Sequence, residues 1–149
     1  MYVYKVKQLV KVVDGDTIDV IIDLGFNILK KERVRVAGID APEKRTRDAE
    51  EKVLGWAATE WMITRLNNLK LDGKELVIKT EKDGKYGRML GWLYEQDKSE
   101  DPVEWLSNIR SINMEMVEEG YAWEYDGKAK NKDLEALRVI RRARGSLSE

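Results

Sequence analysis

Two segments meet at a tight turn in residues 12–23, which read Val12-Val13-Asp14-Gly15-Asp16-Thr17-Ile18-Asp19-Val20-Ile21-Ile22-Asp23. The dipeptide Asp14-Gly15 is typical of the turn of a β-hairpin. Beyond the turn, Ile18, Val20 and Ile22 share one face, because successive side chains of a strand point to opposite sides. The stretch therefore predicts a β-hairpin whose second strand buries one face.

The neighbouring residues extend this hairpin into a sheet. Residues 2–13 alternate between apolar and polar types and predict the first strand. A second turn is expected at Gly25-Phe26-Asn27. Residues 28–37 predict a third strand, in which Arg33 and Arg35 share one face. Three strands joined by short turns form an antiparallel meander.

The periodicity changes from that of a strand to that of a helix over residues 47–70. An apolar stripe recurs there at helical spacing, and Asp72-Gly73 ends the segment. The stripe consists of Leu54, Ala58, Trp61, Met62, Leu66 and Leu69. Two further strands are expected at residues 75–80 and 88–94, with Asp83-Gly84 as the turn between them.

Two shorter helices are predicted in the C-terminal part, after an acidic and irregular segment at residues 95–109. The first, at residues 112–119, turns Met116 and Val117 inward and ends at Gly120. The second is expected to begin near Asn131, a good N-cap, and to run to about Arg142, with Gly145 after it. The arginines around this helix are expected to face solvent: Arg138, Arg141, Arg142 and Arg144.

The predicted order is three strands, one helix, two strands and two helices. Five short strands with a helix after the third are typical of an OB-type barrel. We therefore expect a mainly β, α+β fold, namely a five-stranded OB-fold Greek-key barrel with three helices; an open α+β sandwich is the alternative. The chain has 149 residues, which predicts a single domain over residues 1–149.

The composition restricts the chemistry that the chain can carry out. It contains neither histidine nor cysteine, so imidazole and thiolate groups are excluded as catalysts and as metal ligands. Any metal must be held by oxygen atoms, which hard cations such as Ca²⁺, Mg²⁺ and Mn²⁺ prefer. The net charge of −1 excludes a global positive field, so nucleic acid would have to bind at local basic clusters.

The sequence also bears on location. No apolar run approaches the roughly 20 residues of a membrane-spanning helix. The N-terminus alternates like a strand and lacks the apolar core of a signal peptide. We therefore expect a cytoplasmic, monomeric protein without a membrane partner, and Met1 favours this over a mature form that has lost a leader.

Two clusters near the N-terminus combine turn residues with charged side chains. The first is Asp14-Gly15-Asp16-Thr17, in which Asp16 is placed to bind a cation. The second reads Arg35-Val36-Ala37-Gly38-Ile39-Asp40-Ala41-Pro42-Glu43. In it Asp40 is a second hard ligand, Glu43 is free to act as a base or to orient water, and Arg35 offers a planar fork for a phosphate. Taken alone, each cluster is more often a solvated turn or loop.

A third cluster completes the set, and it reads Asp83-Gly84-Lys85-Tyr86-Gly87-Arg88. Arg88 would lie beside a phosphate, opposite Arg35, and Tyr86 would contact the phosphate or the nucleotide. Alone, this cluster is also a common hairpin. Together, the three clusters supply two acids for a metal, one free carboxylate and two arginines, which is a complete set for phosphodiester hydrolysis.

The three clusters, in this order, resemble the motifs of the staphylococcal nuclease (thermonuclease) family. The matching segments are residues 12–17, residues 35–43 and residues 83–88, with a weaker fourth match at residues 113–122. The resemblance extends over about residues 5–145. It implies a calcium-dependent nuclease that hydrolyses DNA and RNA with little sequence preference.

The resemblance implies a role for each matching residue. The metal ligands are the side chains of Asp16 and Asp40 and the backbone carbonyl of Ala41, with Ca²⁺ as the cofactor. The catalytic residues are Arg35, Glu43 and Arg88. The substrate-binding residues are Lys85, Tyr86 and Tyr125, although packing explains Tyr125 equally well.

Two points remain open at this stage. The segment from Gln96 to Arg110 is longer than the family's usual connection, and we expect an elaborated loop rather than a lid or a partner surface. The alternative function is a catalytically silent OB-fold module that binds nucleic acid or another partner. The alternative is disfavoured because no acid, arginine or glutamate of the set is missing.

Overall fold

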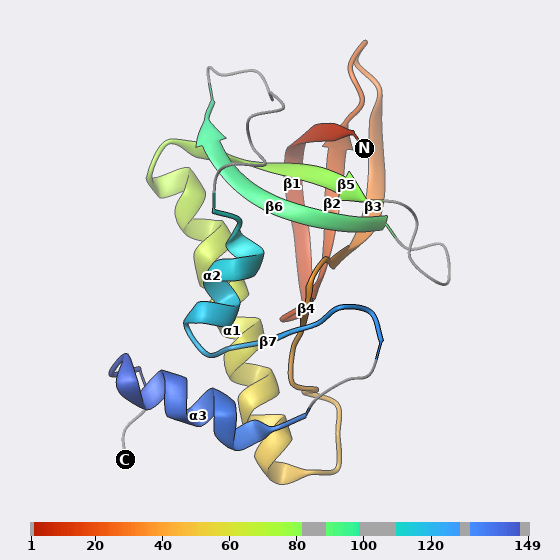
Figure 1. The fold of residues 1–149 in the computed structure, drawn as a ribbon. Helices are drawn as coiled ribbons and strands as arrows, with labels where there is room; N and C mark the ends of the chain where they lie inside the picture. The colour runs from red at the N-terminus through yellow and green to blue at the C-terminus, as the bar shows by residue number, and fades with distance from the viewer. Residues whose placement is uncertain (1, 82–88, 99–109, 129–131, 147–149) are drawn as a thin grey trace.

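The computed structural model describes residues 2–81, 89–98, 110–128 and 132–146. Five strands close into a barrel in the order β1-β2-β3-β6-β5 (Figure 1). They are β1 (Val3–Asp14), β2 (Thr17–Asp23), β3 (Leu29–Val36), β5 (Lys74–Glu81) and β6 (Met89–Asp97). Neighbouring strands are antiparallel except β3 and β6, which run parallel. The mainly β barrel expected from the sequence is confirmed.

The parallel pair closes the barrel. Parallel strands need a long crossover connection, and here the chain forms β4, a helix and β5 between β3 and β6. On its return, β6 places Leu90 opposite Arg35 and Gly91 opposite Val36. The backbone N–H of Ala37 then donates to the carbonyl of Gly91 over 2.9 Å. The end of β3 is therefore fixed from both sides, by β2 and by β6.

Alternate residues of the strands fill the barrel interior. In β2, Ile18, Val20 and Ile22 are at most 1% exposed, as their spacing predicted. Val34 and Val36 of β3 are fully buried in the same core. Because side chains alternate along a strand, Arg33 and Arg35 of β3 lie on the outer face of the sheet.

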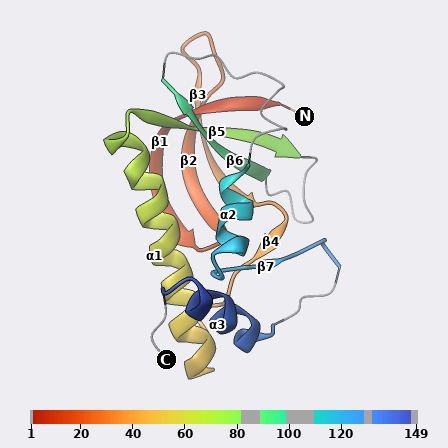
Figure 2. The same ribbon diagram turned by 60° about the vertical axis from the view of Figure 1, so that its left-hand side comes forward.

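The helix α1 (Ala49–Leu71) packs along the side of the barrel formed by β1 and β5 (Figure 2). Asp48 caps its N-terminus by accepting hydrogen bonds from the N–H groups of Glu50 and Glu51. At the other end, Gly73 adopts a positive φ of 69°, which favours glycine. All of the predicted apolar stripe is buried except Trp61, which is half-buried.

Two short helices and a two-stranded ribbon complete the fold. The helices are α2 (Ile112–Glu118) and α3 (Leu134–Ala143), and the ribbon pairs β4 (Ile39–Asp40) with β7 (Trp123–Glu124). The sequence did not predict this ribbon, because two residues are too few to show alternation. None of the helices in the described residues is both long enough and apolar enough to span a membrane.

The structure corrects three details at the C-terminal side. The N-cap of α3 is Asp133, which accepts from the N–H of Ala136, rather than Asn131, which lies outside the described residues. Arg141 does not face solvent: it is 8% exposed, and its guanidinium lies 4.5 Å from the ring centre of Tyr121. The strand predicted at 88–94 extends to Asp97, so Gln96 belongs to the barrel.

Candidate active site

One end of the barrel brings the first two charged clusters together. The backbone N–H of Val36 donates to the carbonyl of Asp16 over 2.8 Å. The N–H of Ala41 donates to Oδ2 of Asp16 over 2.9 Å. The turn between β1 and β2 is thus joined directly to the turn around β4, which carries Asp40. The two turns are far apart in the sequence, and the closure of the barrel brings them into contact.

Gly15 is required in the β1–β2 turn by packing rather than by turn conformation. It does not have the positive φ of the commonest two-residue hairpin turns. A Cβ at this position would lie 2.8 Å from Cβ of Ala58 and 2.9 Å from Cε of Met116. The turn that carries Asp16 therefore rests directly on α1 and α2.

Arg35 connects the two turns through its guanidinium. Nη1 donates to the carbonyls of Val36 at 3.0 Å and Asp16 at 3.3 Å, and Nη2 donates to the carbonyl of Ile39 at 3.0 Å. Nη2 also lies 3.5 Å from a carboxylate oxygen of both Asp16 and Asp40. The side chain of Arg35 is only 16% exposed. The predicted metal ligands and one predicted catalytic arginine therefore form one contiguous cluster.

This arrangement fits a bound cation. The side chains of Asp16 and Asp40 are 14% and 5% exposed, and both already face one cationic group, the Arg35 guanidinium. All available donors are oxygens, which suit a hard divalent ion. In the part of the chain that the structure describes, no three acidic side chains gather as a metal site. Two carboxylates would therefore need main-chain carbonyl, water or phosphate oxygens to complete the coordination.

The side chain of Glu43 is exposed to solvent. Its backbone, in contrast, is held in place by contacts with α1. Its N–H donates to Oε2 of Glu51, a buried residue of α1, over 3.0 Å. Its carbonyl carbon and oxygen lie 2.4 and 2.5 Å from where a Cβ of Gly55 would be. Any side chain at position 55 would collide with this backbone. The helix thus sets the place from which Glu43 projects.

Glu51 also receives a cation from the far end of the chain. Nζ of Lys132 lies 3.2 Å from Oε2 of Glu51, whose side chain is 9% exposed. Burial opposes the charged form of Lys132, but the hydrogen bond that it donates to Glu51 and the negative charges of Glu51, Glu43 and Asp40 outweigh burial and raise the pKa of Lys132. Lys132 is therefore a cation close to the site.

Two further residues support the turn around β4. Asn113 of α2 is fully buried; its Nδ2 donates to the carbonyls of Ala37 at 2.7 Å and Gly91 at 3.2 Å. Its Oδ1 accepts from the N–H of Leu93 at 2.8 Å. The backbone N–H of Tyr125 donates to the carbonyl of Gly38 at 2.9 Å, which places this half-buried tyrosine beside the same turn.

Nothing in the sequence indicates that Glu51 and Gly55 support the site. Asn113 begins the weaker fourth match to the family, and Lys132 belongs to a lysine-rich segment typical of a solvated loop, but their contacts could not be predicted. The third cluster stays a prediction, because Lys85, Tyr86 and Arg88 lie outside the described residues.

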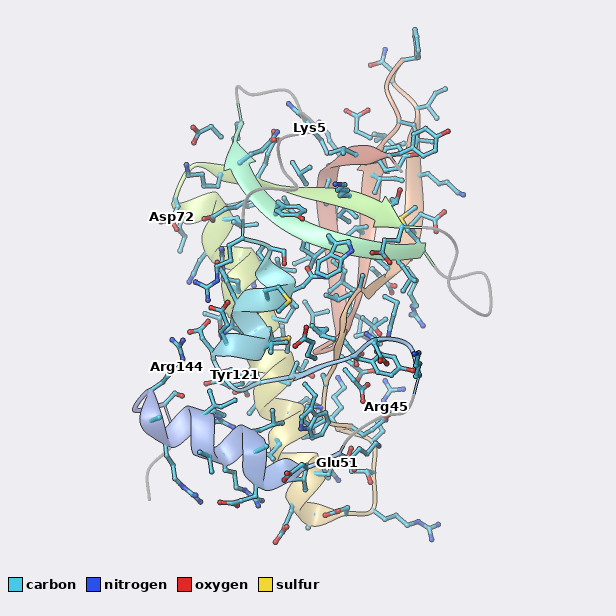
Figure 3. The ribbon with its side chains drawn as sticks, in the orientation of Figure 1. Lys5, Arg45, Glu51, Asp72, Tyr121 and Arg144 are labelled. Carbon is cyan, nitrogen blue, oxygen red and sulfur yellow. The ribbon has the colours of Figure 1, made fainter. Side chains whose placement is uncertain are left out.

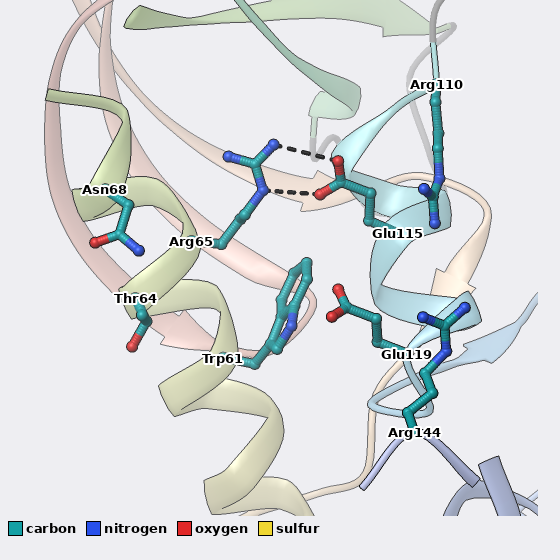
Figure 4. A pocket seen from close by; sticks show the side chains of 8 residues that line it. All are labelled: Trp61, Thr64, Arg65, Asn68, Arg110, Glu115, Glu119 and Arg144. Atoms are coloured by element: carbon teal, nitrogen blue, oxygen red, sulfur yellow. Dashed lines mark hydrogen bonds and ion pairs between the residues drawn. The ribbon is translucent and has the colours of Figure 1, made fainter. Parts of the chain in front are cut away.

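A groove of about 460 Å³ lies elsewhere, between α1, α2 and the end of α3 (Figure 4). None of the predicted site residues lines it. Arg65 crosses it to Glu115, with Nε 2.7 Å from Oε2, and also reaches Glu95 at 3.2 Å. Because Arg65 and Glu115 at its centre neutralise one another, this part of the groove has the character of an interhelical ion pair rather than of a catalytic cleft.

Comparison with known proteins finds similar sequences over most of the chain. The family model for staphylococcal nuclease homologues matches residues 33–146. A protein named ParB of Escherichia coli is 36% identical over 141 residues, covering 93% of this chain and 67% of the relative. A micrococcal nuclease of Shigella flexneri is 34% identical over 137 residues, covering 92% and 68%. An uncharacterised endonuclease of E. coli O157:H7 is 30% identical over 119 residues, covering 80% and 60%.

Proposed function

The chain belongs to the staphylococcal nuclease family, and from this premise we propose that it is a calcium-dependent nuclease. Its relatives include proteins named as a nuclease and as endonucleases, which supports hydrolysis of nucleic-acid phosphodiesters. We further propose that it acts on both DNA and RNA with little sequence preference. In this chain neither imidazole nor thiolate can take part, since histidine and cysteine are absent, so any metal must be held by oxygen ligands.

The observation that carries the proposal is the convergence of Asp16 and Asp40 on Arg35. We assign Asp16, Asp40 and the carbonyl of Ala41 to the calcium ion. When bound, the ion would polarise a phosphoryl oxygen and neutralise charge. Arg35 would stabilise the charge that develops on the phosphate in the transition state. The low exposure of these groups strengthens such interactions by limiting competition from water.

An exposed carboxylate on a fixed backbone supports a role for Glu43 in acting on water. Its carboxylate is exposed, whereas its backbone is fixed by Glu51 and by the contact with Gly55. We propose that it orients the attacking water or takes its proton. By motif, Arg88 would be the second arginine at the phosphate, and Lys85, Tyr86 and Tyr125 would contact the substrate.

A plasmid-degradation assay tests the proposal. We expect cleavage with Ca²⁺, none with EDTA, and a strong loss in the Glu43→Ser and Arg88→Ala variants, since single electrostatic or acid-base groups contribute about 10²–10⁴-fold. If wild-type protein with Ca²⁺ cuts no faster than these variants, the enzyme proposal fails. The catalytically silent binding module would then be the better description.

The ligand set also supports weak calcium binding. Two carboxylates and one carbonyl provide little negative charge, so we propose a dissociation constant near the ~10⁻⁴–10⁻³ M of weak sites. The protein would then be almost silent at micromolar calcium. Titration of activity against free Ca²⁺ tests this, and half-maximal activity at or below the micromolar level would contradict it.

A further inference from the structure

A row of cations follows the outer face of the β1–β2–β3 sheet away from the candidate active site. Side chains alternate along β3, so Arg35, Arg33 and Lys31 share its outer face. On the adjacent strands, Asp19 of β2 lies opposite Arg33, and Lys11 of β1 lies opposite Asp19. Successive cations along β3 are two residues, or about 7 Å, apart.

Arg33 is held rigidly but remains open to solvent. Its Nε donates to Oδ1 of Asp19 at 2.8 Å and its Nη2 to Oδ2 at 3.0 Å. The arginine side chain is 55% exposed and the aspartate side chain 12%. The hydrogen bond from Arg33 lowers the pKa of Asp19, which keeps the carboxylate ionised. A guanidinium fork fixed in this way is preorganised for a phosphate, because little side-chain entropy remains to be lost.

The two lysines of this face differ from Arg33 in their surroundings. Lys31 and Lys11 are exposed, and across the described ranges neither side chain forms an ion pair. Lys11 and Lys31 therefore add positive charge to this face beyond the neutralised Arg33–Asp19 pair, although the whole chain has a net charge of −1.

The face is also accessible. In two views the helices lie along the other side of the barrel, and none covers β2 and β3 (Figures 1 and 2). Figure 3 shows Arg45 beside the β4 end of the sheet and Lys5 towards the opposite end. A long ligand that leaves the active site can therefore lie along the sheet without meeting a helix.

We propose that the outer face of β1–β3, with Arg33, Lys31 and Lys11, is a binding track for the phosphodiester backbone of the substrate strand. The inference rests on the proposed function and extends it, because it adds a surface beyond the cleaved phosphate. Backbone contacts of this kind carry no base preference.

The test is a binding titration that needs no cleavage. The variant is Lys11→Gln/Lys31→Gln, and the matched control is Lys70→Gln/Lys98→Gln, which removes two exposed charges from the α1 and β6 side. The probe is a fluorescein-labelled single-stranded DNA 20-mer in EDTA, followed by anisotropy at several salt concentrations. Thermal unfolding of both variants confirms that they are folded.

We expect the track variant to bind about tenfold more weakly and its slope of log K against log salt to fall by about 1.4, which corresponds to two lost phosphate contacts. The control should stay within about twofold of the wild type. With Ca²⁺ and long DNA, KM should rise in the track variant while kcat is unchanged. Equal binding by wild type and track variant, or an equal loss in the control, overturns the proposal.

The two proposals fail in different ways. A protein that binds the 20-mer through this face but cleaves nothing contradicts the nuclease proposal and leaves the track intact. A protein that cleaves DNA with the same KM and the same salt slope after Lys11→Gln/Lys31→Gln contradicts the track and leaves the nuclease proposal intact.

Discussion

At the scale of single residues, Glu51 links the helix scaffold to Glu43. It accepts hydrogen bonds from the backbone of Glu43 and from Lys132 with a side chain that is almost fully buried. Removing it leaves a donor and a cation without their partner, which costs about 1–3 kcal/mol for a buried group. It also frees the backbone that carries Glu43, and displacements of about 1 Å can cost about 10²-fold in rate.

We therefore expect Glu51→Ala to lower both kcat and the free energy of unfolding, whereas Glu51→Gln, which keeps an oxygen acceptor, should recover much of both. Urea titration and steady-state kinetics with Ca²⁺ measure the two effects. A variant that is destabilised but has an unchanged kcat would show that Glu51 does not position Glu43.

Asp19 is expected to make the free energy of unfolding depend on pH in the acid range. Its folded-state pKa is lowered by the hydrogen bond from Arg33, so its stabilising effect is complete above the pKa of the unfolded chain and disappears as the pH falls through the folded-state value. We expect Asp19→Asn to lower the free energy of unfolding modestly at pH 7, because the partner Arg33 is half exposed and water screens the pair. The difference from wild type should shrink as the pH drops below the ordinary range of aspartate.

Urea unfolding of both proteins at neutral and at acid pH measures this difference. A gap between wild type and Asp19→Asn that is constant over the whole range would contradict the assigned role of the Asp19–Arg33 pair.

At the scale of elements, α2 is attached to the barrel through one buried amide. Asn113 bonds to the end of β3 and to β6 and has no contact with water. Asn113→Ala removes three hydrogen bonds and leaves buried backbone groups unsatisfied, so we expect a loss of about 2–4 kcal/mol. Urea titration measures it, with Asn67→Ala on the exposed face of α1 as the control. A similar small loss in both variants would contradict this role.

The sequence predicted elements where a period extends over several residues. Alternation located β2 and β3, and the apolar stripe located α1, because burial of one face selects residues in a regular order. The sequence did not predict the β4–β7 ribbon, in which Asp40 pairs with Trp123. Strands of two residues are too short to show a periodic pattern. The sequence also misplaced Arg141, since charge alone suggested solvent while the aliphatic part of an arginine packs well.

At the scale of the whole molecule, the candidate site could be predicted only in part. Composition excluded imidazole and thiolate chemistry. The motifs then indicated Asp16, Asp40 and Arg35, which the barrel brings together. The residues that support Glu43 could not be found in this way. Glu51 and Lys132 are 81 positions apart and meet only because α3 folds back onto α1.

Metal binding should appear as a change in the stability of the whole chain. A ligand that binds only the folded state stabilises it by an amount that depends on the ratio of its concentration to Kd. With a Kd of ~10⁻⁴–10⁻³ M, about 10 mM Ca²⁺ should add about 1–3 kcal/mol. Urea unfolding with and without Ca²⁺ measures this, and Asp40→Asn should show no gain. An equal gain in Asp40→Asn would remove Asp40 from the ligand set.

The carbonyl bonds of Arg35 have a consequence for how this fold can diverge. The guanidinium that is proposed to face the phosphate also ties the end of β3 and the start of β4 to the β1–β2 turn. A related protein that loses cleavage through substitution of Arg35 also loses the hydrogen bonds that hold these segments together. Catalysis and architecture are thus inherited together at one position. A silent descendant can more easily lose Glu43 first, because its exposed carboxylate forms no hydrogen bond or ion pair in the described chain.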